Sequence, residues 1–291
     1  MIPPTFDYVV PKSLPEAVSL LSKNGEAKIL AGGQSLIPMM RFRLASPAVL
    51  IDINRLTDLE YIREADGWLK IGALTREAEL DASQLVHDRY TLLADTTRVV
   101  ADPLVRNLST IGGNLAHADP ANDHPATMLA YGAQIIATGP DGERVIPATD
   151  FFLGPFESAL ASNEILTEIR IPAYQPRSAG AYFKLERKVG DFATAAVAVQ
   201  IRLDANGNCA AAGIGLTNVG FTPIKATAAE DALTGQPLND ANIKQAAHLA
   251  SQAAEPESDQ RGPAEYKRAL VKTLTGRALR KALERAEGGS S

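Results

Sequence analysis

The chain has 291 residues, which suggests about two domains and a hydrophobic core large enough to fold without disulfide or metal cross-links. Its net charge of −5 at pH 7 excludes the strongly basic surface that nucleic acids require, and no run of about 18 apolar residues predicts a membrane span. The single cysteine, Cys209, excludes an intrachain disulfide and the four thiolates that usually hold an iron–sulfur cluster, and it fits a reducing, cytoplasmic setting.

The first part of the chain carries helix and strand signals around a pair of glycines. Ser13 can cap a helix, Pro15 is tolerated in the first turn, and Gly25 can end the helix. The apolar run of residues 48–53 is typical of a strand covered on both faces. We therefore expect a helix, a strand, a glycine turn, a helix and a strand, at residues 13–24, 28–31, 32–33, 36–44 and 48–53.

The middle of the chain mixes the same signals. Helical stretches are predicted near residues 75–80 and 91–100, and a second glycine turn at residues 109–114. Residues 68–72 begin this second part. The expected strands are residues 134–138 and 144–146, joined by the turn 139–142.

Near residues 171–176 the pattern breaks, and we place a domain boundary there. Beyond it, apolar residues occupy every second position from Val197 to Leu203, as expected for a strand with one buried face. Asn206-Gly207 predicts a hairpin turn, with the partner strand at residues 209–216. Alanine-rich helices follow, so this part is predicted to be an α+β domain with an antiparallel sheet and helices.

Two glycine-containing segments, Ala31-Gly32-Gly33-Gln34-Ser35 and Thr110-Ile111-Gly112-Gly113-Asn114, are the most informative features. Glycine permits φ > 0 and lets a ligand approach the backbone. Consecutive N–H groups in such turns form an anion-binding concavity, and the helix expected after the first turn adds partial positive charge. Ser35, Thr110 and Asn114 can add side-chain hydrogen bonds, so two such turns can grip a diphosphate from both sides.

A Gly-Gly pair after a strand is, by itself, more often only a turn. Neither segment matches the dinucleotide-binding G-x-G-x-x-G pattern or the P-loop. The residues alone therefore predict a candidate phosphate or dinucleotide site and leave the simple turn open.

The same two segments, the first continuing through Leu36-Ile37-Pro38, resemble the two FAD-binding signatures of the carbon monoxide dehydrogenase medium-subunit family. That family belongs to the wider xanthine dehydrogenase, or molybdenum hydroxylase, group. The resemblance covers essentially the whole chain, and its further matching segments are Pro4–Tyr8, Ala101–Arg106, Asp119–Asp123, Lys188–Ala196, Ile214–Val219 and Arg261–Tyr266.

The resemblance implies an α+β fold with two domains. The first is a two-lobed FAD-binding domain of the vanillyl-alcohol-oxidase (PCMH) type over residues 1–175, with lobes at about 1–56 and 57–175. A smaller C-terminal α+β domain of the CO dehydrogenase flavoprotein type is expected at residues 176–287, and residues 288–291 are predicted to be a flexible tail.

FAD is expected to lie between the lobes, with its diphosphate against both glycine segments. Asp123 resembles a contact near the nucleotide half, and Leu166, Lys184 and Phe192 match positions near the isoalloxazine, although core packing or a solvated charge stays open for these three. The cofactor-binding residues that the resemblance implies are Ala31, Gly32, Gly33, Gln34, Ser35, Leu36, Ala101, Thr110, Ile111, Gly112, Gly113, Asn114, Asp123, Leu166, Lys184 and Phe192.

The resemblance also implies electron transfer rather than substrate hydroxylation. A large molybdenum subunit with a molybdopterin-type cofactor would oxidise carbon monoxide, an aldehyde, a purine or another N-heterocycle. A small subunit with 2Fe-2S clusters would carry the electrons to FAD in this chain, for an external acceptor. A dimer of heterotrimers is expected, without nucleic acid. We assign no catalytic residue and no metal ligand to this chain, since no Cys/His set has zinc spacing.

Two other functions stay open. A stand-alone flavin oxidoreductase with its own substrate pocket is compatible with the same fold, because fold alone does not decide function. A nucleotide-binding assembly subunit without redox activity is the third possibility. Among the scattered histidines, His87, His124 and His248 are interpreted as surface or structural residues, whereas His117 follows the second glycine segment and is a candidate contact of FAD or of a partner subunit.

Overall fold

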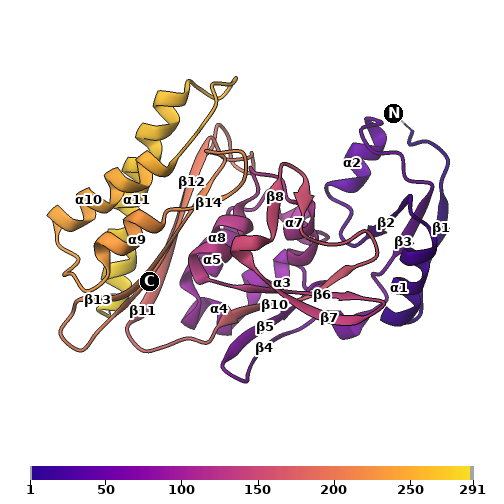
Figure 1. The fold of residues 1–291 in the computed structure, drawn as a ribbon, viewed down its shortest axis with the longest axis horizontal. Coiled ribbons are helices and arrows are strands. Elements are labelled where there is room, and N and C mark those ends of the chain that lie inside the picture. Colours follow the sequence, from indigo (N-terminus) through magenta and orange to yellow (C-terminus); the bar gives the residue numbers. More distant parts are fainter. Residues whose placement is uncertain (1, 289–291) are drawn as a thin grey trace.

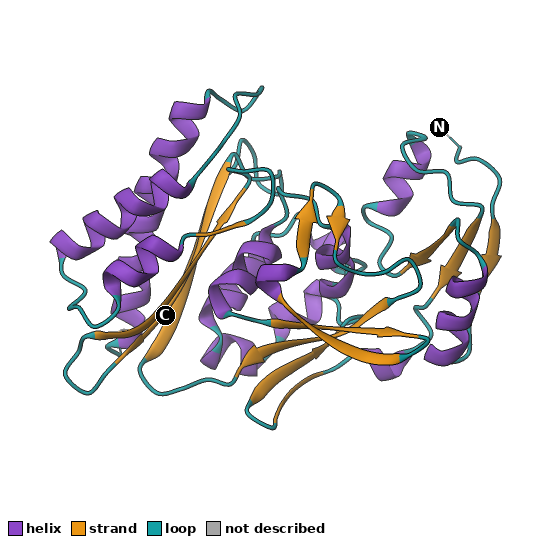
Figure 2. Ribbon diagram, in the orientation of Figure 1, coloured by secondary structure: helices purple, strands orange, loops and turns teal. Residues whose placement is uncertain are grey.

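The structure is a computed structural model that describes residues 2–288. Its secondary structure forms three successive sheet-containing parts along the long axis of the molecule (Figures 1 and 2). At the N-terminal end, a parallel three-stranded sheet has the order β1-β3-β2. The elements of this part are β1 (Asp7–Val9), α1 (Leu14–Lys23), β2 (Ala27–Leu30), α2 (Leu36–Arg41) and β3 (Val49–Asp52).

The local signals of this part act as predicted, with shifts at the ends. Ser13 caps α1, and its hydroxyl accepts from the Glu16 amide at 3.3 Å. The helix ends at Lys23 and Asn24 is its C-cap residue, one position before the predicted glycine. Helix α2 ends at Arg41, three residues before the predicted end at residue 44. Strand β1 is not among the predicted elements, because its three residues are too few to show a period.

The central part is an antiparallel five-stranded sheet of order β4-β5-β10-β6-β7. Its strands are β4 (Ile62–Ala65), β5 (Trp68–Gly72), β6 (Gln134–Gly139), β7 (Gly142–Pro147) and β10 (Ile165–Pro172). The remaining elements are η1 (Thr57–Leu59), α3 (Glu77–Ala82), α4 (Gln84–Arg89), α5 (Thr91–Arg98), α6 (Pro103–Arg106), α7 (Ile111–His117), α8 (Asp123–Tyr131), η2 (Ala148–Asp150), β8 (Phe152–Gly154) and β9 (Glu157–Ser158).

The C-terminal part is an antiparallel four-stranded sheet of order β11-β12-β13-β14, followed by helices. Helices α10 and α11 lie on one face of this sheet, while α5 and α8 lie on the other (Figure 1). Its elements are β11 (Ser178–Leu185), β12 (Ala195–Leu203), β13 (Cys209–Thr217), β14 (Ile224–Lys225), α9 (Thr227–Leu233), α10 (Asp240–Ala253) and α11 (Ala264–Ala286). The predicted α+β class, with an antiparallel sheet and helices at the C-terminus, is confirmed.

The prediction that β12 buries only one face is wrong. Ala196 and Ala198, on its second face, are also fully buried, because α8 packs there. Helix α8 comes so close to the adjacent strand that a Cβ at Gly213 or Gly215 would lie 1.8 Å or 2.0 Å from a main-chain carbonyl oxygen of the helix. Small residues on this face therefore allow helices to pack on both faces of the sheet.

The proposed domain limits of 1–175 and 176–287 stay predictions; strand β10 runs to Pro172 and β11 begins at Ser178. The predicted tail falls, apart from Gly288, outside the described residues. No helix within residues 2–288 combines the length and apolar character needed to cross a membrane.

Candidate FAD site

The two glycine segments lie against each other in space. We call residues 31–36 the first glycine segment and residues 110–114 the second. A Cβ placed on Gly32 would lie 2.3 Å from the carbonyl oxygen of Leu108 and 2.7 Å from Cα of Ser109, the residues that lead into the second segment. Only a residue without a Cβ permits this approach, so Gly32 fixes how closely the two segments pack.

The first glycine segment presents a row of unpaired main-chain donors. Within residues 2–288, the five consecutive amides from Gly32 to Leu36 have no hydrogen-bond acceptor. Gly33 has a φ of +71°, in the left-handed region, while Ser35 is right-handed. Successive free amides in a turn can bind anions. The free amides of this segment are therefore available to a diphosphate, and their contact with FAD stays a prediction.

The second glycine segment is not a turn, and in this respect the prediction is wrong. Thr110 caps α7, and Gly112 and Gly113 belong to its first helical turn. Neither Gly112 nor Gly32 adopts a positive φ. The amides of this segment are already used: that of Gly112 donates to Ala73 O at 3.0 Å, that of Gly113 to Thr110 Oγ1 at 3.1 Å, and those of Ile111 and Asn114 also donate within the chain.

Glycine at position 112 has a packing reason. A Cβ there would lie 2.6 Å from both the carbonyl oxygen and Cβ of Ala73. The second segment therefore cannot offer a second row of free amides, and the closely packed backbone that leads into it forms a wall against the first segment.

Two side chains of that wall carry polar atoms without partners. Ser109 Oγ and Asn114 Oδ1 are buried and make no hydrogen bond within the described part of the chain. Buried polar atoms are nearly always paired, so such orphans indicate a missing ligand or water. Together with the free amides of the first segment, they fit a cofactor that is rich in phosphate and hydroxyl groups, as FAD is.

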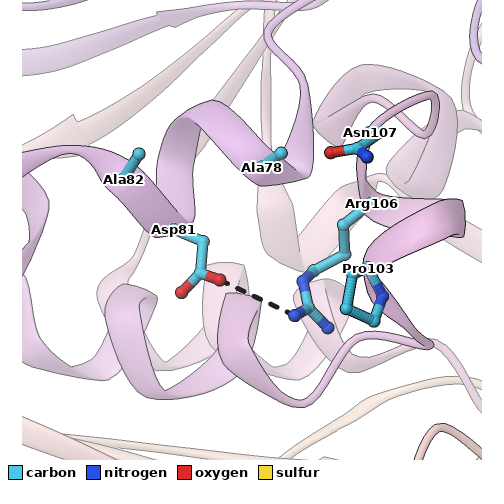
Figure 3. A pocket seen from close by; sticks show the side chains of 6 residues that line it. All are labelled: Ala78, Asp81, Ala82, Pro103, Arg106 and Asn107. Carbon is cyan, nitrogen blue, oxygen red and sulfur yellow. Dashed lines mark ion pairs between the residues drawn. The ribbon is translucent and has the colours of Figure 1, made fainter.

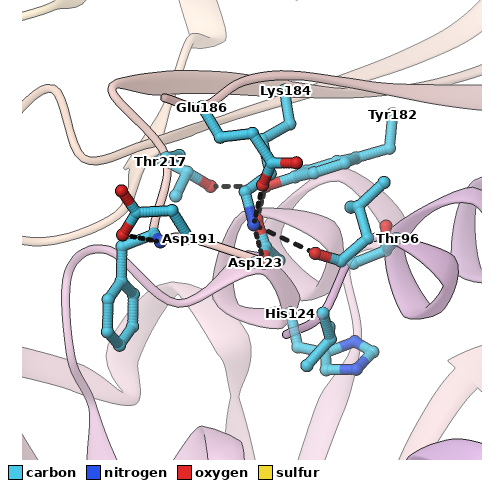
Figure 4. A network of polar contacts seen from close by, with 12 residues as sticks. Thr96, Asp123, His124, Tyr182, Lys184, Glu186, Asp191 and Thr217 are labelled. Carbon is cyan, nitrogen blue, oxygen red and sulfur yellow. Dashed lines mark hydrogen bonds and ion pairs between the residues drawn. The ribbon is translucent and has the colours of Figure 1, made fainter. Parts of the chain in front are cut away.

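A second polar cluster joins α8 to the C-terminal sheet (Figure 4). Lys184 Nζ donates to Asp123 Oδ2 at 2.9 Å and to the carbonyl of Val99 at 3.0 Å, and Tyr182 donates to Asp123 Oδ1 at 2.7 Å. The Lys184 side chain is only 3% exposed and is therefore not a solvated charge. Burial raises the pKa of Asp123, an effect that the lysine beside it opposes.

Asp123 and Lys184 were expected to contact the cofactor, and the structure brings them together at one place. Glu186 Oε2 lies 3.4 Å from the same ammonium group and has no hydrogen-bond partner among residues 2–288. Lys184 is the last but one residue of β11, and the loop that carries Phe192 follows this strand.

The other expected contacts lie in two different settings. Phe192 is 47% exposed in the loop after β11, and the Ala101 backbone touches the same loop, since a Cβ on Gly190 would lie 2.9 Å from Ala101 O. Ile111 and Leu166, in contrast, belong to the apolar core of the central part. Their side chains are core residues, and contact with FAD stays a prediction for both.

Two residues that link the glycine segments are not among the predicted site residues. Asn54 and Arg76 link the two glycine segments through hydrogen bonds. His124 pairs with Glu77 at 2.8 Å, and both side chains are completely buried, which agrees with a structural role for this histidine. No local pattern marks these residues, because their partners are distant in the sequence.

His117 lies at the end of α7, with its ring centroid 5.1 Å from that of Phe156. Burial lowers the pKa of His117, so the imidazole is neutral at pH 7. Its contact with FAD or a partner subunit stays a prediction.

The clearest hollows of the surface lie away from these segments. One of about 200 Å³ lies between α3 and α6, where Arg106 and Asp81 approach to 3.7 Å (Figure 3). A second, of about 520 Å³, lies between α1 and the β6–β7 turn. Neither includes a residue of a glycine segment, so the candidate site rests on the unpaired polar atoms described above.

No metal centre can be assigned to residues 2–288, because no three His, Cys, Asp or Glu side chains are grouped there to hold an ion. Cys209 is buried in β13, and burial raises the pKa of its thiol to about 11. This thiol has the character of a packing residue.

Comparisons with known proteins bear on the same segments. Residues 4–174 match the family model described as the FAD binding domain in molybdopterin dehydrogenase, and residues 180–282 match the CO dehydrogenase flavoprotein C-terminal domain. The chain is 45% identical to the carbon monoxide dehydrogenase medium chain of Hydrogenophaga pseudoflava, over 98% of this chain and 99% of that one. It is 39% identical to the 6-hydroxypseudooxynicotine dehydrogenase complex subunit alpha of Paenarthrobacter nicotinovorans, over 98% and 97%.

A solved structure agrees with the whole fold. A chain of carbon monoxide dehydrogenase from Hydrogenophaga pseudoflava, in a form that lacks the Mo-pyranopterin moiety, superposes with a TM-score of 0.95 at 46% identity and covers 98% of this chain and 99% of that chain. The expected resemblance is thus confirmed over both domains. The chain belongs to the family of FAD-binding subunits of molybdenum-dependent dehydrogenases, which includes the medium chain of carbon monoxide dehydrogenase.

Proposed function

We propose that this chain is the FAD-carrying electron-transfer subunit of a heterotrimeric molybdenum-dependent dehydrogenase. The observation that carries the proposal is the row of five unpaired amides from Gly32 to Leu36, opposite the unpaired polar atoms of Ser109 and Asn114. A diphosphate satisfies these donors without a lysine or arginine, because converging amides carry partial positive charge.

Bound FAD supplies the redox chemistry, namely the transfer of electrons from the 2Fe-2S clusters of a small partner subunit to an external acceptor. The protein supplies position and polarity. The first glycine segment holds the diphosphate, and the second closes the opposite side. Lys184 and Asp123, at the base of the Phe192 loop, place a buried charge pair beside the rest of the cofactor.

The cofactor contacts that we propose remain those that the sequence implies, with the roles that the geometry favours. The main-chain amides of residues 32–36 bind the diphosphate. The side chains that contact FAD are those of Asn114, Asp123, Lys184 and Phe192. Thr110 acts indirectly, since its hydroxyl is occupied as the cap of α7. Ala31, Ala101, Ile111, Gly112, Gly113 and Leu166 shape the backbone and the floor of the site.

The partners that we propose are a small 2Fe-2S subunit and a large molybdenum subunit, arranged as a dimer of heterotrimers in the cytoplasm. Relatives named as chains of multisubunit dehydrogenases support the first part of this proposal. The substrate is a property of the large subunit. Relatives named for carbon monoxide and 6-hydroxypseudooxynicotine differ in substrate but share this chain's full length.

A stand-alone flavin oxidoreductase is the alternative. The full-length similarity to a medium chain and to an alpha subunit favours the multisubunit function. Purification from the native source distinguishes the two functions. We expect the chain to copurify with two partners, a larger one that contains molybdenum and a smaller one that contains iron. A solitary chain that oxidises a small substrate through its own FAD would favour the alternative.

Flavin binding itself is measured on the purified chain. We expect about one FAD per chain and a visible flavin spectrum that dithionite bleaches. A colourless protein that takes up no FAD from solution contradicts the proposal, and a spectrum that dithionite leaves unchanged supports a nucleotide-binding assembly subunit instead.

A further inference from the structure

Arg76 and Asn54 connect the two glycine segments, although neither belongs to them. Asn54 uses both ends of its amide: Nδ2 donates to Ala31 O at 2.8 Å, and Oδ1 accepts from Arg76 Nη2 at 2.7 Å. The other terminal nitrogen of Arg76 donates to the carbonyl oxygen of Leu108. A continuous chain of hydrogen bonds therefore runs from the first segment to the residue that leads into the second.

The carbonyl of Leu108 is also the atom that Gly32 approaches most closely. Arg76 thus holds this oxygen where the Gly32 backbone packs on it. The main chain beside Arg76 strengthens the arrangement, since Arg76 forms a bridge with Thr110, and the Glu77 amide donates to Ser109 O at 3.0 Å. The planar guanidinium suits this task, because it offers donors in two fixed directions, whereas an ammonium group is a point charge.

We infer that Arg76 and Asn54 are positioning residues for FAD: they fix the spacing of the two walls that hold its diphosphate. The inference rests on the proposed FAD site. Neither residue needs to touch the cofactor, and both terminal nitrogens of Arg76 already have acceptors in the chain. Loss of either link lets the walls separate, which weakens FAD binding without removing any cofactor-binding group.

The test uses the full-length chain, freed of flavin and titrated with FAD well below its unfolding temperature. Arg76→Lys keeps the charge but replaces two donor nitrogens, each with its own acceptor, by a single nitrogen at the end of a shorter side chain. Asn54→Asp keeps the acceptor for Arg76 but loses the donor to Ala31 O and to Asp52 Oδ1, and it places a second carboxylate beside Asp52. We expect each substitution to raise the Kd for FAD about tenfold, because a hydrogen bond to or from the bridge is lost.

A matched control is Arg144→Lys. Arg144 also bridges a side chain and a main-chain carbonyl, since its guanidinium donates to Glu164 at 2.6 Å and to Ala159 O at 2.6 Å. It lies on strand β7, outside both glycine segments. We expect its Kd for FAD to stay within about twofold of that of the unmodified chain.

A purely structural role gives a different pattern. It would lower the melting temperature of all three variants and leave the Kd of the folded protein unchanged. In addition, the double variant of Arg76 and Asn54 should bind FAD about as weakly as the weaker single variant, because both substitutions break one chain of contacts. If the two single increases in Kd instead multiply in the double variant, the coupling that we infer is overturned.

Failure of the inference and failure of the proposed function are distinguishable. An unmodified chain that takes up no FAD defeats the proposed function. Tight FAD binding by both Arg76→Lys and Asn54→Asp defeats the positioning role and leaves the FAD site intact. Should Arg76→Lys not accumulate as folded protein, the isosteric Asn54→Asp decides alone.

Discussion

Gly32→Ala is the substitution for which the structure predicts the sharpest effect on FAD. The new methyl carbon would lie 2.3 Å from the carbonyl oxygen of Leu108, whereas ordinary van der Waals contact begins at 3.4 Å, so the two glycine segments have to separate by about 1 Å. Relief of such overpacking costs about 1–3 kcal/mol. Since 1.4 kcal/mol corresponds to about a tenfold change in an equilibrium constant, we expect the Kd for FAD to rise about tenfold or more.

The assay is a titration of the flavin-free chain with FAD, followed by flavin fluorescence. Gly25→Ala is the control, because a Cβ at Gly25 meets nothing within 4 Å in the same N-terminal part. It should leave the Kd within about twofold. A Gly32→Ala variant that binds FAD as tightly as the control would show that the contact between the segments does not set the geometry of the site.

Three further predictions concern stability, measured by urea unfolding. Lys184→Met should cost about 3 kcal/mol, because Asp123 is left buried without its partner, and the double variant with Asp123→Asn should recover part of this loss. Glu164→Gln should cost about 0.5–1 kcal/mol of unfolding free energy at pH 7. Two hydrogen bonds from Arg144 hold the pKa of Glu164 below its ordinary value of 4.5. This contribution is therefore present above pH 4.5 and disappears as the pH falls through the lowered pKa. A cost that is unchanged at low pH contradicts that assignment. Gly215→Ala should cost about 2 kcal/mol or more, because its Cβ would lie 2.0 Å from a carbonyl of α8; a neutral effect would mean that α8 moves freely on the sheet.

The elements with local signals were predictable from the sequence. Ser13 caps α1 as expected, and the hairpin at Asn206-Gly207 joins β12 to β13. Each of these signals acts within a few residues, so the sequence alone contains the whole interaction.

Helix α7 shows why other elements were missed. Two consecutive glycines disfavour a helix by about 1 kcal/mol each, so the sequence predicts a turn. In the folded chain, the Thr110 cap and the hydrogen bond from Gly112 to Ala73 O stabilise the helix. Both glycines face atoms that a larger side chain would strike, and this tertiary requirement is invisible in the local pattern.

Which of the named residues contact FAD stays a prediction, whereas the arrangement of the two glycine segments can be compared with the structure. The first glycine segment has free amides as expected, whereas those of the second are used within the chain. Asn54 and Arg76 could not be found, because their importance depends on contacts with residues 23 and 32 positions away. Only the fold brings these partners together.

The central claim is that the amides of the first glycine segment hold the diphosphate of FAD, with the second segment as the opposite wall. A crystal structure of the chain with FAD tests it most directly. We predict diphosphate oxygens about 3 Å from amide nitrogens of residues 32–36, and a ligand or bridging water on Ser109 Oγ and Asn114 Oδ1. A diphosphate bound elsewhere, with these amides still facing solvent, would contradict the account.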